Sequence, residues 1–213
     1  MSFNVAVLVS GNGSNLQALI DSPKLAASTV AIVKVISNVP SAFALTRAER
    51  ANIPSRVIEH RGFDSREAFD RAIVDELQQA RVDLVVLAGF MRVITPVLLE
   101  AFRYRVVNVH PALLPAFPGM HGVRQALAYG VRVAGCTVHL VDAGVDTGPI
   151  LAQSVVNVLD EDDEASLAAR IHAEEHRLLP QAVCWFAENR VSITEVEGRA
   201  RARIRRDDHE PRL

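Results

Sequence analysis

Several features that mark special classes of protein are scarce in this sequence. Its 213 residues include only two cysteines, Cys136 and Cys184, which form no metal-binding or redox motif and suggest no disulfide framework. No apolar run is long enough to cross a bilayer, and the N-terminal stretch has neither the basic flank nor the cleavage site of a signal peptide. We therefore expect a protein of the reducing cytoplasm with no membrane partner.

An excess of charge of either sign is missing too. The 23 basic and 25 acidic residues give a formal net charge of −2, so nothing attracts the protein generally to nucleic acid. One basic run, residues 199–206, is rich in arginine, but it contains no aromatic side chains for base stacking, and two aspartates follow it. We interpret residues 199–213 as a C-terminal tail or an edge hairpin and expect no nucleic-acid partner.

The first half of the sequence does contain a regular alternation of strand-like and helix-like segments. This pattern predicts a Rossmann-like, doubly wound α/β fold with a mostly parallel sheet and helices on both faces. At Asp64-Ser-Arg-Glu67 we expect Asp64 to be the N-cap of a helix. The expected strands are residues 4–9, 30–36, 56–58, 83–88 and 105–109, and the expected helices are residues 16–27, 42–51, 64–80 and 96–102.

The alternation changes after about residue 131. Residues 136–141 are typical of a strand with one exposed face, because polar and apolar side chains alternate there, and residues 150–158 predict a second strand. A long helix from about residue 164 to residue 188 follows, and residues 191–196 predict a last edge strand. These segments predict an antiparallel C-terminal extension. No linker or internal repeat separates the parts, so we expect a single domain over residues 1–198.

The stretch from Asn108 to Gly119 carries the strongest candidate chemistry. Asn108 and His110 lie two positions apart near the end of an apolar strand, so their side chains point the same way. The carboxyl edge of an open α/β sheet is where ligands bind, and Pro111 keeps His110 extended at that edge. A proline-rich crossover with one buried histidine explains these residues equally well.

A glycine-rich turn, Gly11-Asn-Gly-Ser-Asn15, lies between the first strand and the first helix. Backbone N–H groups and a helix N-terminus at such a turn favour a phosphate group. The turn is not a dinucleotide fingerprint, because Leu16 stands at the third glycine position, and no Gly-Lys-Ser/Thr of a Walker loop follows. A small phosphate ester is the preferred ligand, and an ordinary turn without a ligand is the alternative.

Two further features of the first half are ambiguous by themselves. Arg66, near the start of its helix, can reach an anion or remain solvated. Leu87-Ala-Gly-Phe-Met-Arg92 leaves a strand at the ligand edge, where Gly89 allows close backbone approach. Its Phe90 and Met91 either line a flat apolar slot or pack into the core.

An acidic loop in the second half offers a partner for the histidine. Asp142 or Asp146 beside His110 would favour the charged imidazolium. By itself, an acidic loop of this kind is more often a surface turn.

The segment His172-Ala-Glu-Glu-His176 matches the H-x-x-E-H pattern of some zinc peptidases. Two histidines at positions i and i+4 of a helix can hold a metal. No further acid-bearing helix follows to complete such a site, so we prefer a polar helix face and expect no metal.

Four of these stretches occur in an order and spacing that resemble a known family. They are Ser10-Gly-Asn-Gly-Ser-Asn-Leu-Gln17, Leu87-Ala-Gly-Phe-Met-Arg92, Asn108-Val-His-Pro111 with Leu113-Leu-Pro115, and Val138-His-Leu-Val-Asp142 with Asp146. Over roughly residues 3–190 the sequence resembles the phosphoribosylglycinamide formyltransferases of purine synthesis. Each motif is weak when it is taken alone, whereas the ordered set is strong.

This resemblance implies a formyltransferase fold and the transfer of a formyl group from 10-formyltetrahydrofolate to the amine of glycinamide ribonucleotide, without a metal. The catalytic trio of the family corresponds to Asn108, His110 and Asp146. The positions that hold the ribose phosphate correspond to Gly13, Ser14, Asn15 and Arg66, and Glu175 matches a contact to the glycinamide end. The folate pocket corresponds to Met91, Arg92, Val93, Ile94 and Asn108, with the loop at residues 141–146 on its other side. A monomer or a homodimer is expected.

The sequence departs from the pattern of this family at a few positions. Ala112 stands where a serine is common, Met120 where a leucine is, and Gly122-Val123 replaces more polar residues. We expect none of these positions to touch the trio, so that they affect rate or affinity more than the type of reaction.

Other functions remain open from the sequence. Methionyl-tRNA formyltransferase resembles this domain but carries an extra C-terminal RNA-binding domain, and only about 20 residues remain here after the resemblance ends. Formyltetrahydrofolate hydrolase has an added N-terminal regulatory domain, whereas the first strand begins at once in this chain. A non-enzymatic module that binds a phosphoribosyl ligand would keep the glycine-rich turn without needing the trio. The intact turn favours a phosphorylated small acceptor.

Overall fold

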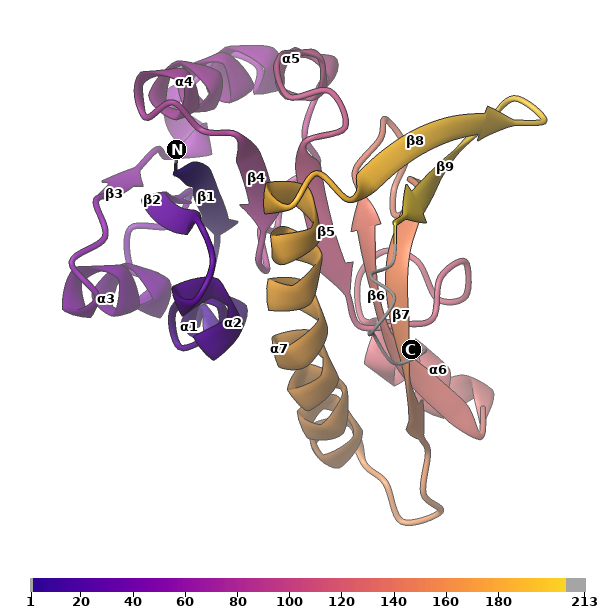
Figure 1. Cartoon of the computed structure of the whole chain (residues 1–213). Coiled ribbons are helices and arrows are strands. Elements are labelled where there is room, and N and C mark those ends of the chain that lie inside the picture. The colour runs from indigo at the N-terminus through magenta and orange to yellow at the C-terminus, as the bar shows by residue number, and fades with distance from the viewer. Residues whose placement is uncertain (1, 206–213) are drawn as a thin grey trace. The chain divides into compact units, whose positions relative to one another are not determined.

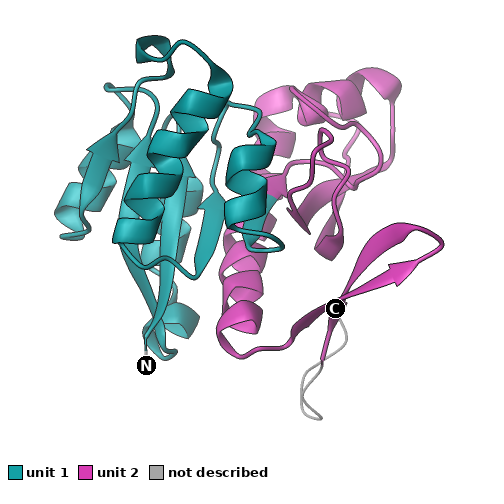
Figure 2. Ribbon diagram, turned by 90° about the horizontal axis from the view of Figure 1, so that it is seen from above, with its two compact units in different colours: residues 1–108 teal, residues 109–213 magenta. Residues whose placement is uncertain are grey.

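A computed structural model describes residues 2–205 of the chain. The chain divides into two compact units, Met1–Asn108 and Val109–Leu213, which Figure 2 shows in teal and magenta. Among the described residues, no helix is both long enough and apolar enough to span a membrane.

The first unit is built on a parallel sheet, as the sequence predicts. Its strands lie in the order β3-β2-β1-β4-β5, and each neighbouring pair is parallel. Residues 5–9 of β1 and all residues of β4 are apolar and buried, which is typical of a sheet covered on both faces. The strands are β1 (Phe3–Val9), β2 (Val30–Ser37), β3 (Ser55–Val57), β4 (Leu84–Leu87) and β5 (Val106–His110).

Helices cover both faces of this sheet. In Figure 1, α1 to α3 lie on one side of the strands, and α4 with α5 lies on the other. This arrangement confirms the predicted doubly wound α/β class. The helices are α1 (Ser14–Ile20), α2 (Pro23–Ala26), α3 (Phe43–Arg50), α4 (Arg66–Gln79) and α5 (Pro96–Ala101), with a short 3₁₀ turn η1 (His60–Gly62) before α4.

Two local predictions in this unit are wrong. The helix expected over residues 16–27 is divided into α1 and α2, because Ser22 caps a new helix whose first residue is Pro23. The N-cap of α4 is Ser65 and not Asp64, since the Ser65 hydroxyl accepts the N–H of Ala68 at 3.1 Å.

The second unit contains an antiparallel pair of strands, which confirms the predicted antiparallel extension. Strand β6 pairs with β7, and the long helix α7 packs against both. Strand β8 pairs with β9 to form a hairpin that contacts β7 (Figure 1). The elements are α6 (Gly122–Tyr129), β6 (Val133–Leu140), β7 (Ile150–Asn157), α7 (Glu164–Ala187), β8 (Val191–Val196) and β9 (Arg199–Ile204).

The prediction that β6 has an exposed face is wrong. Every residue of β6 after Val133 is buried. Helix α7 covers one face, and the polar Thr137 is bound by the loop that follows β5, donating to the Ala112 carbonyl at 2.6 Å and accepting the Leu114 N–H at 3.0 Å. Helix α6 and strand β9 were not predicted as elements, although a hairpin was one interpretation of residues 199–213. Residues 206–213 of that segment lie outside the described part of the chain.

Candidate active site

The candidate residues of the first unit lie at the carboxyl edge of its parallel sheet. Strands β1, β4 and β5 all end at this edge, and β4 pairs with β5 so that Leu87 lies beside Asn108. Asn108 is therefore a neighbour of the segment that leaves β4. The predicted ligand edge is thus assembled by the strand order itself.

The glycine-rich turn after β1 is braced by helix α3. Gly13 has a φ of +76°, and a β-carbon at this position would lie 2.6 Å from the Ala44 β-carbon. Gly13 is also the N-cap of α1 and provides no side-chain cap, which leaves the N–H groups of the first turn without one. Arg47 of α3, which the sequence analysis missed, binds Asn12 Oδ1 at 2.7 Å and the Asn12 carbonyl at 2.9 Å.

Arg66 is the first residue of α4, and its side chain is exposed. No acidic side chain of the described residues lies within ion-pair distance of its guanidinium. The arginine is thus able to meet a ligand anion at the N-terminal end of a helix, where the helix dipole also favours negative charge.

The segment after β4 divides its apolar residues between core and solvent. Phe90 is buried and stacks on Phe69 of α4, with the ring centroids 6.5 Å apart, so core packing is the correct interpretation for Phe90. Met91 is 69% exposed and Val93 is 54% exposed, whereas Ile94 is buried. Exposed apolar side chains on neighbouring loop positions are typical of a binding surface.

In the second unit, His110 is buried and both of its ring nitrogens face oxygen atoms. Its Nε2 lies 2.8 Å from the Phe117 carbonyl, which can only accept, so this nitrogen carries a proton and donates. Its Nδ1 lies 3.4 Å from Oδ2 of Asp146. The ring is thus held between this carbonyl and the loop acid, as the sequence predicts for one of the two aspartates.

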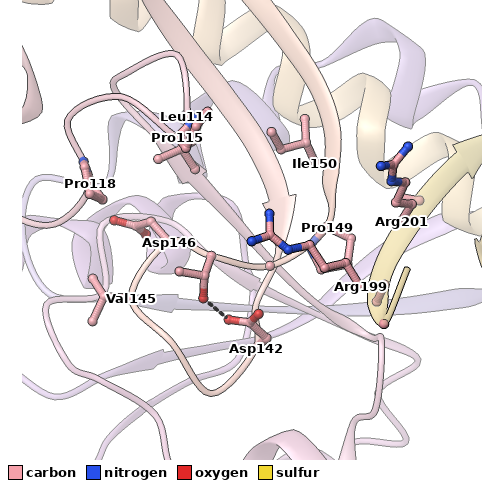
Figure 3. Close-up of a pocket in the computed structure, with 15 residues that line it drawn as sticks. Leu114, Pro115, Pro118, Asp142, Val145, Asp146, Pro149, Ile150, Arg199 and Arg201 are labelled. Atoms are coloured by element: carbon pink, nitrogen blue, oxygen red, sulfur yellow. Dashed lines mark hydrogen bonds between the residues drawn. The ribbon is translucent and has the colours of Figure 1, made fainter. Parts of the chain in front are cut away.

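Asp146 is the loop acid that the structure pairs with His110. Its carboxylate also accepts the Gly119 N–H at 2.7 Å and lies 3.5 Å from Nε2 of His139. Burial alone raises the pKa of Asp146, but the contacts with His139, Gly119 and His110 outweigh it and hold the pKa below its ordinary value. Asp142, the other candidate, instead accepts the Thr147 hydroxyl at 2.7 Å, as Figure 3 shows.

Glu175 lies on α7, where it is buried and paired with a histidine of the same helix. Nδ1 of His172 is 2.9 Å from Oε2 of Glu175, and this hydrogen bond raises the pKa of His172 although burial opposes the rise. His176 stacks on His172, with ring centroids 6.3 Å apart. Among the described residues, no group of three or more potential ligands is placed to hold a metal.

The formyl transferase family matches residues 3–183. A phosphoribosylglycinamide formyltransferase of Escherichia coli is 42% identical over 192 residues, which cover 90% of this chain and 91% of that protein. The crystal structure of glycinamide ribonucleotide transformylase 1 from Symbiobacterium toebii superposes with a TM-score of 0.90 at 47% identity, covering 95% of this chain and 94% of that one.

This chain belongs to the formyl transferase family. It also matches part of a longer protein, the trifunctional purine biosynthetic protein adenosine-3 of Drosophila melanogaster, at 50% identity over 192 residues. Those residues are 89% of this chain, and the chain spans 14% of the length of the Drosophila protein.

The sequence analysis missed one buried histidine of this formyl transferase. His139 is 1% exposed, its Nδ1 faces the Leu140 carbonyl at 2.9 Å, and its Nε2 faces Asp146. Asp146 is thus flanked by two imidazole rings. The available signal was a histidine near the end of an otherwise apolar strand, but nothing local in the sequence shows that the loop after β6 returns to it.

One expectation about the departures from the family pattern is wrong. A β-carbon at Gly122 would lie 3.3 Å from Nε2 of His110 and 3.4 Å from the Ala112 β-carbon. The position of Gly122 therefore lies against the His110 ring, and Ala112 lies beside Gly122. Any side chain at residue 122 must share space with the His110 ring, whereas Met120 is 71% exposed.

A cavity of about 870 Å³ adjoins the loop that carries Asp146 in the second unit of this formyl transferase. Its lining includes Asp142 and Asp146 on one side and Arg199 and Arg201 of the C-terminal hairpin on another (Figure 3). The cavity gives solvent access to the loop that carries Asp146. The hairpin arginines are therefore placed on the approach to the candidate active site.

Proposed function

We propose that this protein transfers the formyl group of 10-formyltetrahydrofolate to the amine of glycinamide ribonucleotide, a step of de novo purine biosynthesis. The observation that carries the proposal is the His110–Asp146 pair, with Nδ1 and Oδ2 3.4 Å apart, in which His110 is the last residue of the strand that also carries Asn108. Membership of the formyl transferase family and identity to full-length bacterial phosphoribosylglycinamide formyltransferases support it.

The reaction needs stabilisation of one oxyanion and one proton transfer. The substrate amine attacks the formyl carbon, a new C–N bond forms, and the formyl oxygen becomes negative in a tetrahedral intermediate. The bond from that carbon to the folate nitrogen then breaks, and the proton lost by the amine passes to this nitrogen. A donor to the oxyanion is worth about 3 kcal/mol, and positioned proton transfer contributes a factor of about 10² to 10⁴.

The trio has the chemical groups that this reaction requires. Asn108 supplies a neutral N–H donor, and the imidazolium of His110 supplies positive charge in a buried place, where charge acts strongly. Asp146 keeps that ring charged and oriented, because its own lowered pKa keeps it an anion at neutral pH. We propose that these three residues are the catalytic set and that the reaction uses no metal.

The remaining residues are assigned to substrate binding. We propose that Gly13, Ser14, Asn15 and Arg66 bind the ribose phosphate, and that Glu175 contacts the glycinamide end. We propose that Met91, Arg92, Val93, Ile94 and Asn108 bind the folate. The exposed apolar side chains of Met91 and Val93 support this assignment, since a flat ring system needs an apolar surface.

We further propose that residues 1–198 act as one formyltransferase domain, because the family matches residues 3–183 as a single stretch. We place the protein in the cytoplasm as a monomer or a homodimer. Its partners are small molecules, without nucleic acid or membrane. The near-zero net charge supports the last part of this proposal.

A spectroscopic assay of formyl transfer from 10-formyltetrahydrofolate to glycinamide ribonucleotide tests the function. The wild-type protein should transfer the group to the amine, whereas a formyltetrahydrofolate hydrolase would release formate without the amine. His110→Ala and Asp146→Asn should each lose several powers of ten in kcat. Asp75→Asn is the control, because this exposed carboxylate of α4 has no role in the proposed site. Near-normal kcat in the first two variants would refute the catalytic assignment.

The phosphate assignment is tested separately. Arg66→Ala should mainly raise KM for glycinamide ribonucleotide, because the guanidinium contacts a part of the substrate that does not react. Arg71→Ala is the control on the same exposed stretch of α4. An equal effect of the two variants on this KM would contradict the role of Arg66.

A further inference from the structure

Residues 89–95 form an arch that has no helix or strand of its own between β4 and α5. Phe90 near its first end and Thr95 at its second end are buried, whereas Met91 and Val93 at its middle are 69% and 54% exposed. A segment without regular backbone hydrogen bonds keeps one shape only when other elements hold it. The contacts at the two ends of the arch therefore decide how its exposed residues are presented.

Ser10, the residue after β1, holds the first end of the arch. Its hydroxyl accepts the Met91 N–H at 2.8 Å and donates to Oδ1 of Asn38 at 2.6 Å. Its backbone N–H also donates to the Gly89 carbonyl at 3.1 Å. Because β1 lies between β2 and β4 in the sheet, this one serine joins the carboxyl ends of three neighbouring strands.

Asp70 of α4 holds the second end of the arch. Its carboxylate accepts the Thr95 N–H at 2.5 Å, and the Asp70 side chain is buried at 1% exposure. The preceding residue of α4, Phe69, stacks on Phe90 inside the arch. Helix α4 thus fixes the arch through one hydrogen bond and one ring contact, and Ser10 fixes it through two further hydrogen bonds.

We propose that Ser10 and Asp70 are positioning residues of the formyl-donor site, which hold the arch so that Met91 and Val93 present a preformed apolar surface to the folate. This inference rests on the proposed function, in which residues 91–94 bind the folate. Neither residue touches substrate in this assignment. Their effect is to remove the cost of ordering the arch when the donor binds.

The expected effects follow from the contacts that are lost. Ser10→Ala removes the acceptor for the Met91 N–H and the donor for Asn38, and Asp70→Ala removes the acceptor for the Thr95 N–H. Each should raise KM for 10-formyltetrahydrofolate about tenfold, the scale of one to two net hydrogen bonds. KM for glycinamide ribonucleotide should stay within about twofold of the wild type, because the arch does not bind the amine substrate.

Two control variants separate positioning from general loss of structure. Asp70→Asn keeps an oxygen that can accept the Thr95 N–H and should restore most of the affinity for the donor. Ser22→Ala removes another serine hydroxyl of the same unit, which is buried and accepts the Leu25 N–H at 3.3 Å to cap α2. It should lower stability without changing KM for the donor.

Amide hydrogen exchange by NMR gives a readout that does not depend on activity. The Met91 amide should exchange faster in Ser10→Ala, and the Thr95 amide should exchange faster in Asp70→Ala, with α1 and β1 unchanged. Unchanged exchange at these amides overturns the inference, as does faster exchange without a rise in KM for the donor. A wild-type protein that transfers no formyl group refutes the proposed function instead. The exchange rates then test only whether Ser10 and Asp70 hold the arch.

Discussion

Gly13→Ala tests how tightly the glycine-rich turn is built into the first unit. Gly13 has a φ of +76°, and an L-residue in this left-handed region costs about 1–2 kcal/mol. The new β-carbon would also lie 2.6 Å from the Ala44 β-carbon and 2.9 Å from its α-carbon, and such overpacking costs about 1–3 kcal/mol. The lower entropy of the unfolded chain returns less than about 1 kcal/mol.

The contact with Ala44 cannot be relieved cheaply. Ala44 is completely buried at the start of α3, and its N–H donates to the Gly11 carbonyl at 3.1 Å. Moving it therefore disturbs both the helix and the turn. After the entropy gain is subtracted, we expect Gly13→Ala to lower the free energy of unfolding by about 1–5 kcal/mol, which for a chain of this size shifts Tm by about 2–20 °C.

Gly11→Ala is the matched control in the same turn. A β-carbon at Gly11 meets nothing within 4 Å, and its backbone is not in the left-handed region, so its effect should stay within about 0.5 kcal/mol. Urea unfolding followed by circular dichroism, together with calorimetry, measures both variants. The reasoning fails if the two variants unfold within about 0.5 kcal/mol of each other.

Three further predictions concern titrating groups. The contacts of Asp146 lower its pKa, so the stabilisation that this carboxylate provides is present above pH 3.8 and is lost as the pH falls through the pKa of the folded protein. In urea unfolding between pH 3 and pH 6, the difference in stability between the wild type and Asp146→Asn should shrink toward acid. A difference in stability that does not depend on pH would contradict this. The hydrogen bond with Glu175 raises the pKa of His172, so the stabilisation that is lost in His172→Ala should be fully present below pH 6.5 and should vanish as the pH rises through the pKa of the folded protein. Urea unfolding of both proteins at a series of pH values checks this. A larger loss of stability at pH 9 than at pH 6 would exclude the pairing. Burial raises the pKa of Cys136 to about 12, and Cys184 is also buried. Neither cysteine should therefore react with a thiol reagent at pH 8 until the protein is unfolded. Rapid labelling of the native protein would argue against the packing of β6 and α7.

The predicted elements that proved correct depended on local signals. A short stretch of sequence is enough to predict the apolar strands β1 and β4 and the long helix α7. A continuous apolar run indicates a buried strand, and one apolar stripe indicates a helix, whichever element packs against it. The errors arose where a neighbour decided the outcome. Strand β6 alternates in its sequence, yet it is buried on both faces because α7 covers one of them and the loop at Thr137 covers the other.

The candidate site shows the same division. The order of its motifs was enough to indicate the family and the residues Asn108, His110 and Asp146. The residues alone left Asp142 and Asp146 open, and the resemblance chose Asp146; the structure places Asp146, and not Asp142, beside His110. It also added His139 to Asp146 and placed Gly122 against His110.

The sequence by itself determined the parallel α/β pattern, the glycine-rich turn at its ligand edge and the side chains available for chemistry, since each of these follows from residue type and spacing along the chain. The tertiary structure alone decided which groups surround Asp146 beside the histidine, and which serine and aspartate hold the segment after β4. Such pairings join residues far apart in sequence. They depend on how whole helices and strands pack together, which a short stretch of sequence does not show.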